Sequence, residues 1–147
     1  MSHEEVEMWE YEYSIETDAS VPVIWNLFAD VSGWSRWNAG VARAEILGPF
    51  AVGTRFLMTL PGRETLTSRL VEVRENGGFV DETCVGEARV FVDHSLEAQE
   101  NGRTKITYSL QAFGPGCAQL GRTISMDFPD VLTSLAELAE SEMCAET

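Results

Sequence analysis

The sequence predicts an α+β domain in which a curved antiparallel sheet of about seven strands wraps around a long C-terminal helix. The first observation is that apolar residues recur every three to four positions between Gly114 and Glu142, which forms one apolar stripe along an amphipathic helix. The second is a series of short segments of alternating polarity, separated by turn residues, between Val41 and Ala112. Because Pro129 falls within the apolar stripe, we expect a kink there and not the end of the helix.

The N-terminal part of the chain predicts one strand followed by two short helices. Aromatic and aliphatic residues alternate with polar ones over residues 9–16, which indicates a strand with one buried and one exposed face. Capping residues at positions 17–20, followed by Val21-Pro22, predict a short helix. Trp34 and Trp37 indicate a second helical turn, where they form either a core anchor or a pocket wall.

Turn residues separate the later strands, of which we expect about six. Pro61-Gly62 has the residues of a type II turn, and Asn76-Gly77 is typical of a hairpin. Gly86 closes the following turn.

The hairpin around residues 100–102 allows two registers. With a two-residue loop, the even-numbered residues 92–96 face polar residues of the last strand. With a three-residue loop and a bulge at Gly102, the same residues face the apolar positions of residues 106–110. The second register keeps one face of the hairpin apolar, so it is the one we predict.

Length and charge limit the classes of function. The 147 residues predict one domain over positions 1–147. With 24 acidic residues against 10 basic ones, the formal net charge of −14 argues against nucleic acid and anionic membranes as partners. Much of the acid lies near the chain ends, as in Glu4, Glu5 and Glu146, and is expected to be solvated.

No leader peptide and no apolar run of membrane-spanning length is found, so we expect a cytosolic protein without membrane insertion. The three cysteines, Cys84, Cys117 and Cys144, form no C-x-x-C pair, which favours reduced thiols. With His3 and His94 as the only histidines, a histidine-rich metal centre is not expected. No motif for a nucleotide or other cofactor is found, and the protein is expected to be a monomer or homodimer.

One cluster of polar residues stands out on the predicted inner face. The favoured register places His94 beside Tyr108, and a loop of two or four residues at Gly86 brings Asp81 to the same face. An imidazole, a phenol and a carboxylate together could bind a polar ligand group or move a proton next to a carbonyl. The other interpretation is structural: Asp81 and His94 satisfy each other while Tyr108 packs.

Further candidates are apolar and aromatic residues that point inward and form either core or a ligand wall. They are Trp9, Tyr11, Trp25, Trp37, Phe56, Met58, Leu70, Val92, Leu110 and Phe128. The mouth of a cavity is expected near Trp37, the loop 48–53 and the start of the long helix.

Three motifs follow the predicted elements in order along nearly the whole chain. They are Ala19-x-x-Pro22-x-x-Trp25-x-Leu27-x-x-Asp30-Val31-x-x-Trp34-x-x-Trp37-Asn38 with Gly48-Pro49-Phe50-x-x-Gly53, then Gly102-x-Thr104-x-Ile106-x-Tyr108, then Asp127-Phe128-Pro129-x-Val131-Leu132-x-x-Leu135. With them the chain resembles the SRPBCC superfamily, the START-like and polyketide-cyclase-like helix-grip proteins. Phe79-x-Asp81-Glu82 with His94 also resembles a pattern of its ligand-binding members. The resemblance implies a cavity between sheet and helix that holds an apolar small molecule.

Three functional hypotheses remain open. The first is non-catalytic binding or transport of a hydrophobic small molecule such as a lipid, a polyketide or an aromatic metabolite. The second is a polyketide cyclase or dehydratase with His94 as general acid/base, and Asp81 and Tyr108 orienting it or the substrate carbonyl. The third is a relative of the chaperone-ATPase activators, which share the fold. A cyclase would be helped by a basic docking patch for an acidic acyl carrier, and the sequence offers none, which favours the first hypothesis.

Overall fold

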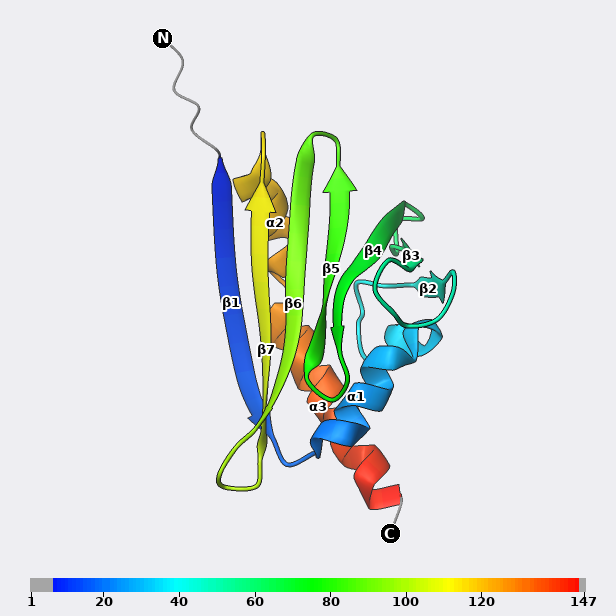
Figure 1. Cartoon of the computed structure of the whole chain (residues 1–147), viewed down its shortest axis with the longest axis vertical. Coiled ribbons are helices and arrows are strands. Elements are labelled where there is room, and N and C mark those ends of the chain that lie inside the picture. Colours follow the sequence, from blue (N-terminus) through cyan, green and yellow to red (C-terminus); the bar gives the residue numbers. More distant parts are fainter. Residues whose placement is uncertain (1–6, 146–147) are drawn as a thin grey trace.

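A single seven-stranded antiparallel sheet, with strand order β1-β7-β6-β5-β4-β3-β2, forms one layer of the protein (Figure 1). The computed structural model describes residues 7–145, so the predicted features at His3, Glu4, Glu5 and Glu146 lie outside it. The strands are β1 (Met8–Thr17), β2 (Arg43–Ile46), β3 (Arg55–Thr59), β4 (Thr65–Arg74), β5 (Gly78–Val85), β6 (Ala88–Ala98) and β7 (Thr104–Phe113). The predicted α+β fold, with a curved antiparallel sheet of about seven strands around a long C-terminal helix, is confirmed.

Helices form the second layer (Figure 1). They are α1 (Val21–Ala29), the 3₁₀ helix η1 (Val31–Arg36), α2 (Cys117–Ser125) and α3 (Phe128–Ala145). The two short helices predicted between the first two strands are therefore confirmed as α1 and η1. No helix in the described part of the chain is both long and apolar enough to cross a membrane.

The predicted long C-terminal helix is present but divided. Helical hydrogen bonding stops after Ser125 and resumes at Phe128, although Met126 keeps a right-handed helical backbone with φ −62° and ψ −25°. Pro129 is the second residue of α3, where its missing N–H removes no helical hydrogen bond. We expected a kink at the proline, and the interruption falls just before it, at residues 126–127. As a result, Asp127 sits between the two helices.

The predicted strand registers are confirmed. His94 pairs with Tyr108 across β6 and β7, and the Gln99 N–H donates to the Arg103 carbonyl at 2.8 Å, which closes the three-residue loop. Gly102 in this loop has φ 84°, a left-handed conformation that favours glycine. In the preceding hairpin, Asp81 pairs with Val92. Since directly paired residues share a face of an antiparallel sheet, these side chains all face the helices.

The turn at Pro61-Gly62 differs from its prediction. A type II turn needs a positive φ at Gly62, but the positive φ in this turn, 71°, belongs to Arg63. The Arg63 N–H donates to the Leu60 carbonyl at 2.8 Å, so the chain still reverses at the expected place.

The core lies between the sheet and the helices. Its largest fully buried side chains include Phe28, Phe56, Phe79, Leu132 and Leu135. The end of β1 is tied to α3 because the Thr17 hydroxyl donates to the Glu140 carboxylate at 2.5 Å. The C-terminal helix is thus held by both apolar packing and a polar contact with the edge strand.

Shortening one core residue of α3 should lower stability far more than shortening its exposed neighbour. Leu135→Ala removes a side chain with no exposed surface, which should cost about 2–5 kcal/mol. The melting temperature should then fall by about 2–4 °C per kcal/mol. Ser134→Ala, at an exposed position of the same helix, is the matched control. Equal melting temperatures for the two variants would contradict this packing.

Candidate functional site

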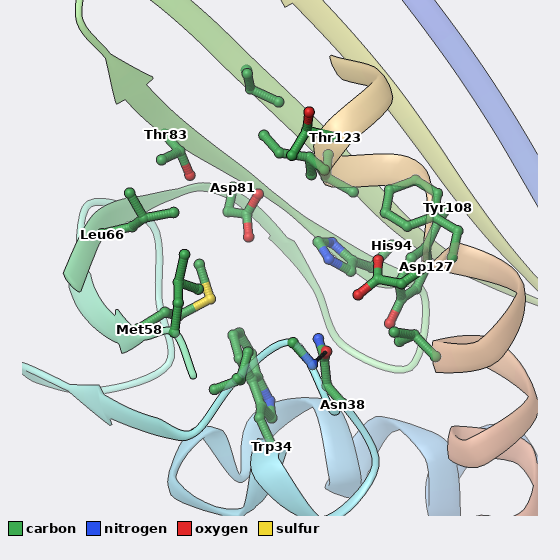
Figure 2. Close-up of a pocket in the computed structure, with 18 of the residues that line it drawn as sticks. Trp34, Asn38, Met58, Leu66, Asp81, Thr83, His94, Tyr108, Thr123 and Asp127 are labelled. Atoms are coloured by element: carbon green, nitrogen blue, oxygen red, sulfur yellow. Dashed lines mark hydrogen bonds between the residues drawn. The ribbon is translucent and has the colours of Figure 1, made fainter. Parts of the chain in front are cut away.

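A cavity of about 300 Å³ lies between the inner face of the sheet, the junction of α2 with α3, and the segment that follows η1 (Figure 2). Most of its lining is aromatic or aliphatic: Trp34, Trp37, Val41, Met58, Leu60, Leu66, Phe79, Val90, Val92, Ile124, Phe128 and Val131. The polar side chains in the lining are Asn38, Asp81, Thr83, His94, Tyr108, Thr123 and Asp127. An apolar chamber with a few polar groups is typical of a small-molecule site.

The strand register brings three rings together at the centre of this lining. The His94 ring stacks on Phe79 with a centroid distance of 4.0 Å and an interplanar angle of 10°. The His94 and Tyr108 rings meet edge to face, with a centroid distance of 4.5 Å and an interplanar angle of 71°. Because Phe79 pairs with His94 and His94 pairs with Tyr108 on adjacent strands, cross-strand pairing places the three rings against one another.

His94 is a neutral imidazole in this setting. Its Nδ1 lies 3.2 Å from the Phe79 carbonyl oxygen, which can only accept, so Nδ1 carries the hydrogen. Burial lowers the pKa of His94 to about 3, and its interactions with the Phe79 and Val92 backbone offset this only in part. The ring therefore presents an uncharged surface to the cavity at neutral pH.

Asp81 shows the opposite response to the same burial. Asp81 is only 6% exposed, and this burial raises the pKa of its carboxyl to about 7. Backbone hydrogen bonds involving Val92 and Asp81 itself lower the pKa, but by less than burial raises it. Within residues 7–145, the carboxyl forms no hydrogen bond with His94, whose Nδ1 binds the Phe79 carbonyl instead. The predicted orientation of His94 by Asp81 is therefore not what the structure shows.

Two buried donors that line the cavity have no hydrogen-bond partner in the described residues: the Tyr108 hydroxyl and the Trp37 Nε1. Burial raises the pKa of Tyr108, and the nearby Asp81 and Asp127 raise it further, so the hydroxyl stays protonated. An unsatisfied buried donor costs about 1–3 kcal/mol, so most such groups have partners. A ligand with an acceptor atom would satisfy them.

Asp127 was not among the predicted site residues, and the break between α2 and α3 places it in the lining. A Cβ atom on Gly40 would come within 2.9 Å of its carboxyl oxygen, so the glycine permits the close approach of these two segments. Burial raises the pKa of Asp127, with a further contribution from Asp130. The Asp-Phe-Pro sequence was the available signal for this position, because a proline near a helix start marks a break.

The predicted ligand wall divides into two groups. Trp37, Met58, Val92 and Phe128 line the cavity. The remaining six residues lie outside its lining: Trp9, Tyr11, Trp25, Phe56, Leu70 and Leu110. Phe56, Leu70 and Leu110 are core residues with at most 1% exposure, whereas Tyr11 is 37% exposed because β1 is an edge strand.

The loop 48–53, expected at the mouth, does not line the cavity. Its Phe50 instead packs edge-on against Trp25 and Phe79, with centroid distances of 5.7 and 5.3 Å. The sequence left the Trp34 and Trp37 pair open as a core anchor or a pocket wall, and both residues line the cavity. Alternation and helical phase identify inward-facing residues but do not distinguish core from cavity wall.

Within the described residues there is no group of three or more His, Cys, Asp or Glu side chains that could hold a metal ion. The polar lining offers hydrogen-bond donors and two carboxyls, and nothing in it has the spacing of a known cofactor motif.

Residues 8–140 match the family described as "Polyketide cyclase / dehydrase and lipid transport". The chain belongs to this family, and the resemblance to helix-grip proteins is thereby confirmed. A search of curated protein sequences gave no match.

Several solved structures share the fold at low sequence identity. The Zhui aromatase/cyclase from Streptomyces sp. R1128 has a TM-score of 0.77 and 16% identity, with 93% of this chain and 96% of that chain covered. Ara h 8.0201 has a TM-score of 0.73 and 15% identity, covering 92% and 99%. A norcoclaurine synthase point mutant from Thalictrum flavum, solved with a transition state analogue, has a TM-score of 0.72 and 12% identity, with 96% of this chain and 99% of that chain covered. At these identities the likeness shows the fold alone.

The opposite pKa shifts of Asp81 and His94 predict opposite contributions to the pH dependence of unfolding. Folded Asp81 keeps its proton up to about pH 7, whereas an ordinary aspartate loses it near 3.8, so its contribution to stability falls as pH rises through this window. Folded His94 stays neutral down to about pH 3, whereas an ordinary histidine gains a proton near 6.5, so its contribution rises with pH. Each slope is about 1.4 kcal/mol per pH unit.

The measurement is denaturant unfolding at several pH values between 4.5 and 6.5. Relative to wild type, Asp81→Asn should gain stability as pH rises, and His94→Gln should lose it. Tyr108→Phe is the control, because it removes a buried polar atom that does not titrate in this range. Three difference curves that all run flat would contradict the assigned protonation states.

Proposed function

We propose that the protein binds a small, ring-containing hydrophobic molecule in the cavity between the sheet and the α2–α3 junction. The observation that carries this proposal is an apolar chamber whose wall holds two buried donors without partners, Trp37 Nε1 and Tyr108 Oη. A ligand with apolar rings and one acceptor oxygen would fill the chamber and satisfy a donor at the same time.

The size of the chamber favours a compact ligand over a long lipid chain. At about 300 Å³ it lies at the low end of the range of roughly 300–1,000 Å³ for small-molecule sites. Its walls include the rings of Trp34, Trp37, Phe79 and Phe128, which stack well on planar ligands. Among lipids, polyketides and aromatic metabolites, a compact aromatic molecule therefore fits best.

Polyketide cyclase chemistry is a second candidate, favoured by one observation: a buried carboxyl with a pKa near 7 lies in the cavity. The Asp81 carboxylate would take a proton from the carbon next to a ligand carbonyl, while Tyr108 donates a hydrogen bond to the forming enolate oxygen. The enolate carbon would then bond to a second carbonyl carbon of the same ligand, and Asp81 would return the proton to the new alkoxide. His94, neutral at this pH, would position the ligand and not transfer the proton.

Filling the chamber should block binding. Val92 lines the cavity, and Val92→Phe adds a ring to that space; Val80→Phe makes the same change on the other face of the sheet. We expect Val92→Phe to weaken binding of a neutral, environment-sensitive naphthalene dye at least about tenfold, a loss of about 1.4 kcal/mol, while Val80→Phe leaves it unchanged. The readout is a fluorescence titration, with native mass spectrometry of detergent-free protein to detect a co-purified ligand.

Equal dye affinity in wild type, Val92→Phe and Val80→Phe would place the dye elsewhere and contradict the proposal. Circular dichroism at the assay temperature checks that each variant is folded, so loss of binding is not loss of structure.

If the protein is a cyclase, its turnover should depend on Asp81 and not on the basicity of His94. Asp81→Asn should lower kcat by about 10²–10⁴-fold, the usual contribution of general acid/base catalysis. His94→Gln should retain most of kcat, because the wild-type ring is already uncharged. The assay follows an aryl poly-β-ketone by mass spectrometry for cyclisation and loss of water. If His94→Gln lost turnover while Asp81→Asn kept it, the result would contradict this assignment and show that His94 is the general acid/base.

A further inference from the structure

The charged side chains that line the cavity are all acidic. Two carboxyl groups, Asp81 and Asp127, belong to its lining, and no lysine or arginine is among the described residues that form it. His94 adds no positive charge, because its ring is neutral. Figure 2 shows the Asp81, His94 and Asp127 side chains directed toward the same space.

The adjacent residue on β5 shows that the chain can supply cations to a carboxylate. Glu82 faces the other side of the sheet, where Arg69 and Arg89 bind its two oxygens at 2.9 and 2.5 Å. Neither Asp81 nor Asp127 forms an ion pair with any residue from 7 to 145. The inner carboxyls thus lack the counter-charge that the outer one has, and a buried carboxylate without one is costly.

Independent observations point to a ligand in the same place. The Tyr108 hydroxyl, in a residue only 3% exposed, and the Trp37 Nε1, in one 4% exposed, line the cavity without a partner. Aromatic rings line the same cavity as the two carboxyls, and among them Tyr108 and Phe128 pack edge to face at a centroid distance of 5.3 Å. Aromatic faces attract organic cations, whereas hard metal ions need a cage of oxygen ligands that this wall lacks.

We propose that the ligand of this cavity is an aromatic molecule carrying a positive charge, such as a protonated amine, held by the Asp81 and Asp127 carboxyls and the surrounding rings. This inference rests on the proposed ligand-binding function and adds the ligand's charge. The formal net charge of −14 also favours the approach of a cation over that of an anion.

Binding of a cation should be linked to a proton. The titratable groups of the lining that face Asp81 are His94 on β6, Tyr108 on β7 and Asp127 between α2 and α3. The lining residues from β3, β4, the segment 34–41, α2 and α3 are not titratable. A cation stabilises the ionised form of Asp81, so its affinity should rise with pH through about 7 and its binding should release a proton below that pH.

The test compares three indoles that share a ring and differ in charge: tryptamine (cation), tryptophol (neutral) and indole-3-acetate (anion). At pH 8, calorimetry should give tryptamine a Kd at least about tenfold lower than tryptophol, with indole-3-acetate the weakest. At pH 6 the tryptamine advantage should shrink, although its amine stays protonated, and titrations in two buffers should detect proton release.

Matched variants identify the groups responsible. Asp81→Asn and Asp127→Asn keep the shape of each side chain and should each reduce the ratio of tryptophol to tryptamine Kd by about 3–10-fold. Asp93→Asn removes one negative charge from the opposite face of β6 and controls for net charge. It should leave the ratio unchanged.

The outcomes separate this inference from the proposed function. If the neutral dye binds and Val92→Phe blocks it, but tryptophol binds as tightly as tryptamine, the cavity binds ligands and the inference about charge is overturned. A tryptamine preference that survives in both inner variants would overturn it as well. If neither the dye nor any indole binds, both proposals fail. The pH dependence of the wild-type protein tests the inference without any substitution.

Discussion

The antiparallel pairing of β5, β6 and β7 is the constraint on which the cavity depends. A shift of one residue in any one of these strands would turn its member of the group, Asp81, His94 or Tyr108, to the opposite face, since side chains alternate along every strand. Two glycine-containing loops determine this register, with Gly86 at φ 60° and Gly102 at φ 84°. The register of the site is therefore set by the turns at the ends of the strands that carry it.

Burial acts on this group of side chains in a consistent direction: it favours the uncharged form of each. The same loss of water raises the pKa of Asp81 to about 7 and lowers that of His94 to about 3, and it keeps the Tyr108 hydroxyl protonated. The outer face of β5 behaves differently, because Glu82 is paired with two arginines, which lower the pKa of its carboxyl. One strand thus carries an ion-paired carboxylate, Glu82, on one face and a carboxyl without an ion pair, Asp81, on the other.

The sequence predicted those features that repeat or that follow from turn chemistry. Alternation, the apolar stripe and the glycine-containing turns were sufficient for the fold, and the side-chain pattern of the last hairpin chose between two registers. Asp127 could not be found in this way, because its place depends on where the helix breaks, and a proline locates a break only to within a few residues. Leu70 and Val92 both point inward, yet only Val92 lines the cavity, since a void depends on how several elements pack.

Binding and catalysis place different demands on the same carboxyl. A cationic ligand would hold Asp81 ionised by its own charge, which strengthens binding but lowers the basicity of the carboxylate. A neutral ketone would leave the pKa of Asp81 near 7. A general acid/base is most effective when its pKa lies near the operating pH. The charge of the natural ligand therefore decides between the two candidate functions: a cation makes the site a binding pocket with an ion pair, and a neutral carbonyl compound makes it a site for proton transfer.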